Sequence, residues 1–198
     1  MKQLVLASAS TVRAQLLEQA GISFEIAPAR IDEAAVKQSL LAEGVRPRGI
    51  ADALAELKAL RISSSRPEAL VLGADQVLDY DGEVLNKCET LDEARIQLKR
   101  LRGRAHRLLS AAVLARNGAV IWRFVDEATL VMRDLSVDFL ESYLARESEA
   151  VLSSVGGYRL EGLGVQLFER IEGDYFSILG LPLVPLLAAL RNQGVLPI

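Results

Sequence analysis

The chain has 198 residues, of which 51% are hydrophobic, enough to bury a core and too many for a disordered chain. Its 23 basic and 26 acidic side chains give a formal net charge of −3, which provides no electrostatic footprint for a nucleic acid polymer or an anionic membrane surface. The single cysteine, Cys88, excludes an intrachain disulfide and a thiolate zinc cluster, and no stretch is long enough to span a bilayer. We therefore predict a cytoplasmic protein.

The single histidine, His106, argues against a Ser-His-Asp triad and against a metal site built from several histidines. Catalysis, if the chain has it, must rest on carboxylates, lysines, arginines and a hard metal ion.

The N-terminal segment predicts a strand over 4–7, a hydroxyl-rich loop and a helix that begins near Val12 and ends at Gly21. Ser10 is expected to cap this helix. The free backbone amides and the dipole of such a helix start suit an anion, and Arg13 offers a planar fork for phosphate oxygens. An ordinary cap and a surface arginine explain the same residues, so both interpretations stay open.

The next segment predicts a strand over 23–27 and then a helix that ends at about Glu43. Asp32 and Glu33 would lie at the start of this helix, where negative charges are favourable. A further helix over 50–63 has leucines and alanines on one side. Lys58 falls on a different face of this helix, and we expect it to face solvent.

The stretch over 73–87 combines an acid and a cation. The apolar run over 69–72 predicts a buried strand, so Asp75 is expected at the end of that strand. Asp81-Gly82 predicts a hairpin turn, after which the chain would return antiparallel and bring Lys87 back toward Asp75. Such a pair suits a metal-bound phosphate, although a loop-capping aspartate and a solvated lysine remain the alternative.

Thr90 and Glu93 match a capping box, which predicts a helix over 91–101. Two apolar runs over 104–115 and 120–132, joined around Asn117-Gly118, predict a long two-stranded hairpin. His106 lies early in this hairpin, and we interpret it as a structural residue.

Ser136 is expected to cap a helix to about Arg146. The glycine-rich stretch over 156–164, which contains Glu161, predicts unusual backbone dihedrals or a close approach to a ligand. A strand over 165–171 and an apolar helix over 183–190 complete the pattern. Mixed strands and helices indicate an α/β or α+β domain around a mixed sheet.

An ordered set of motifs runs nearly from end to end of the chain. It comprises Ser8-Ala-Ser10-x-x-Arg13, Gly73-Ala-Asp75-Gln76, Glu83-Val-Leu-Asn-Lys87, Gly103-x-x-His106, Glu161-Gly-Leu-Gly, Phe168-Glu-Arg-Ile-Glu-Gly and Gly180-Leu-Pro-Leu183. This set resembles the Maf family of nucleoside triphosphate pyrophosphatases. The resemblance implies one domain over 1–198, with an elongated two-lobed mixed-sheet fold similar to that of inosine triphosphate pyrophosphatases and a central cleft.

The resemblance also implies roles for individual residues. Asp75 matches the family's proton acceptor and, with Glu33, a metal contact. The positions that match phosphate contacts are Ser8, Ser10, Arg13, Lys58 and Lys87. A divalent cation is implied, usually Mg2+ with Mn2+ as the other choice, and the family's usual form is a homodimer.

The branch of the family is indicated by three positions. Gln76 and Glu161 match the branch that hydrolyses 7-methyl-GTP, whereas the dTTP and UTP branch has threonine and glutamine there. A carboxylate can accept both the N1 and N2 hydrogens of guanine, which agrees with this choice. Val12 departs from the pattern, because the 7-methyl-GTP branch usually has tryptophan there to stack on the cationic base.

We therefore expect a pyrophosphatase that acts on 7-methyl-GTP or another modified nucleotide. The alternatives are a dTTP and UTP pyrophosphatase of the same family, or a nucleotide-binding regulator of septum formation that does not hydrolyse its ligand. The carboxylate and the cations together favour an enzyme.

Overall fold

The computed structural model of the chain describes residues 3–197, and among these no helix is long and apolar enough to cross a bilayer. The elements in chain order are β1 (Leu4–Leu6), α1 (Thr11–Gln19), β2 (Phe24–Ile26), α2 (Glu33–Ala42), α3 (Pro47–Ser63), β3 (Leu70–Tyr80), β4 (Glu83–Leu85), α4 (Leu91–Leu101), β5 (Ala105–Arg116), β6 (Ala119–Met132), α5 (Val137–Glu147), the 3-10 helices η1 (Ser148–Ser153) and η2 (Leu163–Leu167), β7 (Phe168–Glu172), α6 (Tyr175–Ile178) and α7 (Leu183–Asn192).

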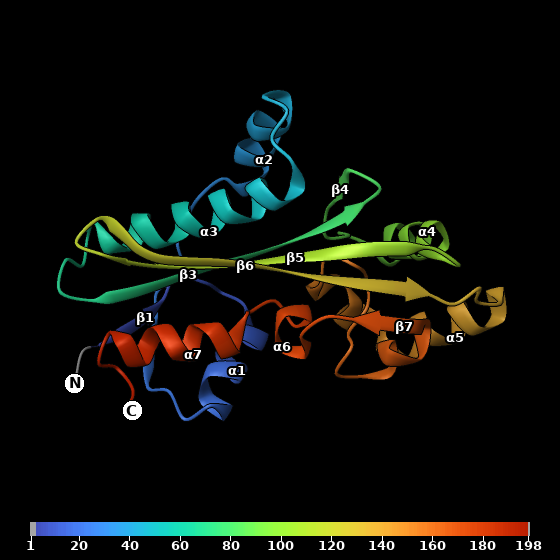
Figure 1. Cartoon of the computed structure of the whole chain (residues 1–198). Helices are drawn as coiled ribbons and strands as arrows, with labels where there is room; N and C mark the ends of the chain where they lie inside the picture. Colours follow the sequence, from blue (N-terminus) through green and yellow to red (C-terminus); the bar gives the residue numbers. More distant parts are fainter. Residues whose placement is uncertain (1–2, 198) are drawn as a thin grey trace.

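The strands form one mixed seven-stranded sheet in the order β2-β1-β3-β5-β6-β7, with β4 paired to β3. β1 pairs parallel with β2 and β3, and the other pairs are antiparallel. The long strands β3, β5 and β6 run along an elongated molecule (Figure 1). This architecture confirms the mixed α/β fold that the sequence predicted.

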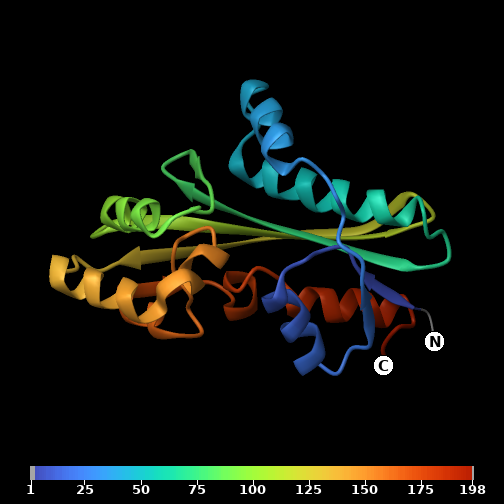
Figure 2. The ribbon, with the colours of Figure 1, turned by 180° about the vertical axis from the view of Figure 1, so that it is seen from behind.

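Helices cover both faces of the sheet. Figure 1 shows α3, with α2 beyond it, over one face and α1, α6 and α7 against the other. The view from behind shows α4, α5, β4 and β7 gathered at the end opposite the termini (Figure 2). The buried residues follow this division, because separate clusters fill the α3 face, the α1 and α7 face and the far end.

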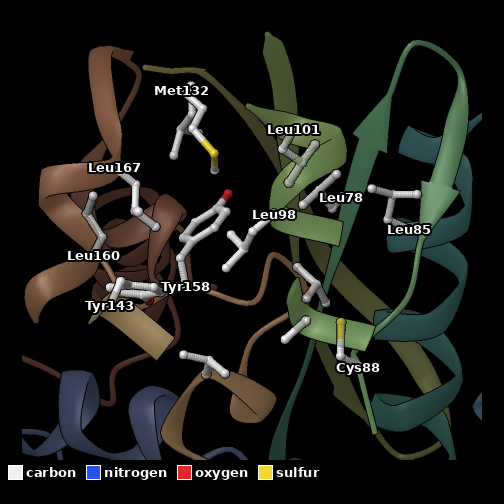
Figure 3. Packing of buried hydrophobic residues seen from close by; sticks show 14 of the residues in the cluster. Leu78, Leu85, Cys88, Leu98, Leu101, Met132, Tyr143, Tyr158, Leu160 and Leu167 are labelled. Carbon is white, nitrogen blue, oxygen red and sulfur yellow. The ribbon is translucent and has the colours of Figure 1, made fainter. Parts of the chain in front are cut away.

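The far-end core surrounds an aromatic pair. Tyr158 lies among residues such as Leu98, Met132 and Leu167 (Figure 3). His106 is 2% exposed, and its Nε2 lies 2.6 Å from the hydroxyl of Tyr158, which agrees with a structural role. Burial lowers the pKa of His106 from 6.5 to about 4, so its imidazole is neutral at physiological pH.

Several local predictions are confirmed. Ser10, Thr90 and Ser136 each accept a hydrogen bond from the backbone of the helix that they cap. Asn117 and Gly118 both have positive φ, as a tight hairpin turn between β5 and β6 requires.

The strand that carries Asp75 is longer than predicted. β3 continues to Tyr80, so Asp75 lies in the middle of the strand and not at its end. The reason is the pairing with β5, which runs along β3 from Val71 to Asp79 and satisfies its backbone groups beyond the end of the apolar run.

The prediction of a strand over 165–171 is wrong in its first part. η2 occupies its first part, and β7 begins only at Phe168. A Cβ on Gly164 would lie 2.8 Å from the backbone nitrogen of Arg159, so the chain folds back on itself here instead of extending.

Candidate active site

A gap along one edge of β3 creates the site. β1 pairs with residues 70–72 of β3 and β4 pairs with residues 78–80, so residues 73–77 have no neighbouring strand on that edge among the described strands. A cleft of about 820 Å³ opens here. It is lined by all of the site residues predicted from the sequence: Ser8, Ser10, Val12, Arg13, Glu33, Lys58, Asp75, Gln76, Lys87 and Glu161.

The alternation of β3 divides its polar residues between two faces. Val77 packs in the cluster under α3, and Asp75, two residues earlier, shares that face. Ala74 packs in the cluster on the α1 side, and Gln76 shares the second face. Because the edge is open between them, both side chains line one cleft.

Gly73 allows α3 to lie directly against this strand. A Cβ on Gly73 would overlap the carbonyl oxygen of Ala55 and lie 2.6 Å from the nitrogen of Ala59. The close approach places Lys58, one residue before Ala59, beside Asp75 on the same face of β3.

Lys58 bridges two carboxylates. Its Nζ lies 2.6 Å from Oδ1 of Asp75 and 2.9 Å from Oε1 of Glu33. The expectation that Lys58 faces solvent is wrong, since the residue is only 6% exposed. The apolar side of α3 is rotated from the predicted one: Ile50 and Leu54 are buried, whereas Leu57 is 40% exposed. Two carboxylates offset the cost of burying the ammonium group.

Asp75 keeps one oxygen without a partner. The residue is 4% exposed, and Oδ2 is buried without a hydrogen bond to any described residue. A buried acceptor left open is rare in folded proteins and points to a group that a ligand completes. In this cleft Oδ2 can accept a proton from water or bind a cation.

Glu33 reaches the cleft from the first turn of α2, which Asp32 caps by accepting a hydrogen bond from Ala35 N. Burial alone would raise the pKa of Glu33, but the charge and hydrogen bond of Lys58, with the charges of Lys37 and Arg13, lower it below its ordinary value. Glu33 therefore stays ionised and available to a cation.

The loop between β1 and α1 forms a cradle of hydroxyls and amides. Ser10 N donates to Ser8 Oγ over 3.2 Å, and Arg13 N donates to Ser10 Oγ over 3.4 Å. The first turn of α1 carries no acidic side chain, so no local charge offsets the positive end of the helix dipole. This helix start suits a phosphate group.

Arg13 is buried and holds the walls of the cleft together. Its Nε donates to Gly180 O over 2.8 Å, and its Nη1 donates to Ser8 Oγ and to Ala74 O, over 3.1 and 2.9 Å. The bond to Ala74 occupies a carbonyl on the open edge of β3. Nη2 takes part in none of these bonds, so it is the part of the fork that remains for a phosphate oxygen.

Lys87 returns to the cleft after the hairpin, as predicted. Asp81 and Gly82, both with positive φ, form the turn between β3 and β4. Loss of hydration and the nearby charges of Arg13 and Lys58 lower the pKa of Lys87, although Glu33 and Asp75 act in the opposite direction. An anion in the cleft would relieve this crowding of positive charge.

Gln76 and Glu161, the two residues predicted to recognise the base, are held by different hydrogen bonds. Nε2 of Gln76 donates to Ser110 Oγ and to the carbonyl oxygens of Ser177 and Ile178, over 2.9, 3.1 and 2.9 Å. Oε1 of Glu161 accepts from Nε of Arg159 over 3.1 Å. Both residues line the cleft, and so does the half-buried Val12.

The donor set fits a hard divalent cation. Among residues 3–197 no group of three or more acidic, histidine or cysteine side chains is placed to hold a metal. Mg2+ is usually bound by one or two carboxylates together with substrate phosphates and water. Glu33 and the open oxygen of Asp75 supply those carboxylates, and phosphate oxygens would complete the shell.

Two basic residues of the cleft, Lys37 and Arg159, were not predicted from the sequence. Lys37 lies one helical turn after Glu33 and donates to Asn86 Oδ1 over 3.4 Å. Its spacing from Glu33 on the predicted helix was a usable signal. Arg159 also lines the cleft, but only its pairing with Glu161, which depends on the fold of the glycine-rich loop, indicates a role.

The chain is similar to known proteins along nearly its whole length. A family model described as Maf-like protein matches residues 3–193. The chain is 54% identical over 193 residues to the nucleoside triphosphate pyrophosphatase of Caulobacter vibrioides, covering 98% of this chain and 96% of that protein. It is 53% identical over 196 residues to the protein of the same name from Granulibacter bethesdensis, covering 99% and 100%. It is 49% identical over 191 residues to the 7-methyl-GTP pyrophosphatase of Brucella abortus, covering 96% of each.

Proposed function

The chain belongs to the Maf family, and from this premise we propose that it is a nucleoside triphosphate pyrophosphatase, which hydrolyses a nucleotide to its monophosphate and pyrophosphate. One observation carries the proposal. Lys58 is buried between Asp75 and Glu33, while Oδ2 of Asp75 remains open in the same cleft. This arrangement combines a proton acceptor, a cation site and positive charge, which hydrolysis of a phosphoric anhydride requires.

The phosphate chain binds to the part of the cleft that carries Ser8, Ser10, Arg13 and Lys87, which we call the cationic wall. The loop of Ser8 and Ser10 offers hydroxyls and backbone amides, and Nη2 of Arg13 and the ammonium group of Lys87 add charge. These groups hold the alpha phosphorus in place and stabilise the negative charge that develops on the departing pyrophosphate.

Asp75 accepts the proton of the attacking water through Oδ2. Lys58 holds Oδ1, which fixes the orientation of the carboxylate and compensates its charge in a buried site. A divalent cation, Mg2+ or Mn2+, held by Glu33 and Asp75 would supply an activated water and neutralise phosphate charge. An ionised carboxylate oxygen has two lone pairs, so Oδ2 of Asp75 could contact the cation and still accept the proton.

The base is a guanine, and 7-methyl-GTP is the leading substrate. Glu161 lies in the cleft, and only its Oε1 accepts a hydrogen bond from a described residue, so Oε2 is available to N–H groups of guanine. Relatives named 7-methyl-GTP pyrophosphatase support this choice. Val12 offers no aromatic face to a methylated base, so GTP and other guanine nucleotides belong in the same test.

The proposal is tested by incubating the purified protein and Mg2+ with 7-methyl-GTP, GTP, dTTP, UTP and CTP, and measuring pyrophosphate and monophosphate. Preference for a guanine nucleotide supports the proposed branch. Preference for dTTP or UTP would support the pyrophosphatase activity but contradict the proposed guanine substrate. Binding of nucleotides without any turnover would contradict the proposed activity and favour a nucleotide-binding regulator.

The base assignment predicts the behaviour of Glu161→Gln. Glutamine retains one acceptor but adds an N–H where guanine also presents N–H groups, so discrimination between GTP and UTP should fall by about tenfold or more. The ratio of kcat/KM for the two substrates measures this effect. A neighbouring exposed acid outside the cleft, Glu169→Gln, serves as the control and should leave the ratio unchanged.

A further inference from the structure

A hydrogen-bond network behind the cleft fixes the amide of Gln76. Its Nε2 faces two carbonyl oxygens, those of Ser177 and Ile178, and the hydroxyl of Ser110. Ser110 and Ser177 are themselves buried. Carbonyl oxygens only accept, so a rotated amide would place Oε1 against two other acceptors and lose both bonds.

This orientation determines which atom the ligand meets. With Nε2 occupied, Oε1 of Gln76 is the amide atom without a partner among the described residues, and Gln76 lines the cleft. A nucleobase that contacts it must present an N–H group. Glu161 also offers an acceptor, so Gln76 and Glu161 together favour a base edge rich in N–H groups.

The short segment that holds Gln76 is tied to the sheet through Ser177. The hydroxyl of Ser177 donates to Oδ2 of Asp126 on β6 over 2.6 Å, and its carbonyl accepts from Ser110 Oγ on β5, also over 2.6 Å. Gly180 N donates to the same carbonyl, and Gly180 O accepts from Arg13. The segment from Ser177 to Gly180 therefore contacts both the amide that faces the base and the arginine that faces the phosphates.

We propose that Ser177, tethered by Asp126, is a positioning residue that fixes Gln76 with Oε1 toward the nucleobase and thereby selects bases with several N–H groups on one edge. The inference rests on the proposed nucleotide site and adds the element that sets its selectivity. Guanine carries an N1 hydrogen and two N2 hydrogens on one edge, whereas hypoxanthine has only the N1 hydrogen. GTP and ITP differ in that amino group alone, so their comparison isolates the effect.

The experiment measures dissociation constants of GTP and ITP by calorimetry, in EDTA without divalent cation so that neither nucleotide is hydrolysed. Wild-type protein should bind GTP about tenfold more tightly than ITP, the loss expected for an unmade hydrogen bond in a buried site. Ser177→Ala and Asp126→Ala should each reduce this preference to about twofold or less. Without the tether to Asp126, the carbonyl oxygens of Ser177 and Ile178 are no longer fixed against Nε2 of Gln76, and the amide can rotate.

Two further variants separate positioning from general damage. Asp126→Asn keeps a side-chain partner for the hydroxyl of Ser177, so it should retain most of the preference. Ser63→Ala removes another buried hydroxyl, one that accepts from Gly118 N outside the cleft, and should leave the preference unchanged. Thermal unfolding identifies any variant that is not folded.

Equal affinity of wild-type protein for GTP and ITP would overturn the inference. So would a full GTP preference in folded Ser177→Ala protein. Pyrophosphate release by wild-type protein with Mg2+ is scored separately, so loss of the proposed activity is distinguishable from loss of the proposed selectivity.

Discussion

At the scale of single residues, the two oxygens of Asp75 have different environments inside the cleft. Oδ1 is held by Lys58, and Oδ2 is buried and open. Asp75→Asn keeps the shape of the side chain but removes the proposed proton acceptor. We expect kcat for pyrophosphate release to fall about a thousandfold, while the dissociation constant for the nucleotide changes by less than about threefold.

The matched control for this variant is Asp79→Asn. Asp79 is a buried aspartate on the same strand, paired with Arg107 and absent from the cleft lining. Its replacement should lower stability but leave kcat within about twofold of wild type. Full turnover by Asp75→Asn protein would remove Asp75 from the mechanism.

His106 predicts a pH dependence of stability. Its pKa is about 4 in the folded protein against 6.5 for the ordinary side chain, so only the unfolded state gains a proton as pH falls from about 6.5 to 4. Stability that is present above pH 6.5 is therefore lost over this window, by up to about 3 kcal/mol at about 1.4 kcal/mol per pKa unit.

Urea unfolding of wild-type and His106→Gln proteins at several pH values checks this expectation. The glutamine variant does not titrate, so its disadvantage relative to wild type should shrink as the pH is lowered from 7 to 4.5. A difference that stays constant over this range would show that His106 does not change its protonation preference on folding.

At the scale of elements, the contact between α3 and β3 depends on Gly73. A Cβ there would overlap backbone atoms of Ala55 and Ala59, which cannot move without moving the helix. Gly73→Ala should therefore destabilise the fold by about 1–3 kcal/mol and also lower kcat, because Lys58 shifts away from Asp75.

Urea unfolding and pyrophosphate release measure the two effects of Gly73→Ala. Gly44→Ala is the control: Gly44 has φ +74, but no heavy atom of the described residues lies within 4 Å of the position that a Cβ would take. Its replacement therefore costs only about 1–2 kcal/mol of backbone strain. Turnover of the control protein should equal that of wild type. An unchanged kcat in folded Gly73→Ala protein would show that the contact does not position Lys58.

At the scale of the whole molecule, the cleft joins parts that pack in separate cores. Its lining includes Ser8, just after β1, and Val12 on α1, two elements whose buried residues share a core with α7. It also includes Tyr158 and Leu160 from the far-end core. A nucleotide that contacts both parts binds the folded state alone. At a concentration about 100 times its dissociation constant it should add about 2.7 kcal/mol of stability.

For a chain of this length, that free energy corresponds to a rise in Tm of roughly 5–10 °C. The measurement uses thermal unfolding of Asp75→Asn protein with GTP, because this variant should bind without consuming the ligand. Guanosine at the same concentration is the control and should raise Tm far less, since it lacks the phosphates that are proposed to bind the cationic wall. An equal shift with guanosine would contradict the assigned phosphate contacts.

Local chemistry in the sequence determined much of this protein. The caps at Ser10, Thr90 and Ser136 and the turn at Asn117-Gly118 were predictable, because each depends on hydrogen bonds or dihedrals within a few residues. The ten site residues that the motif set predicted all lie among the residues that line the cleft, although their roles stay predictions until the variants are assayed.

The tertiary structure alone decided how those residues are held. Lys58 pairs with Asp75 across 17 positions, Arg13 reaches Gly180 across 167, and Gln76 reaches Ser177 across 101. No local pattern encodes such pairs, because they exist only once α3 and the short segment after β7 pack against opposite faces of β3. The open edge of that strand is likewise a property of the assembled sheet, since it depends on where β1 ends and β4 begins.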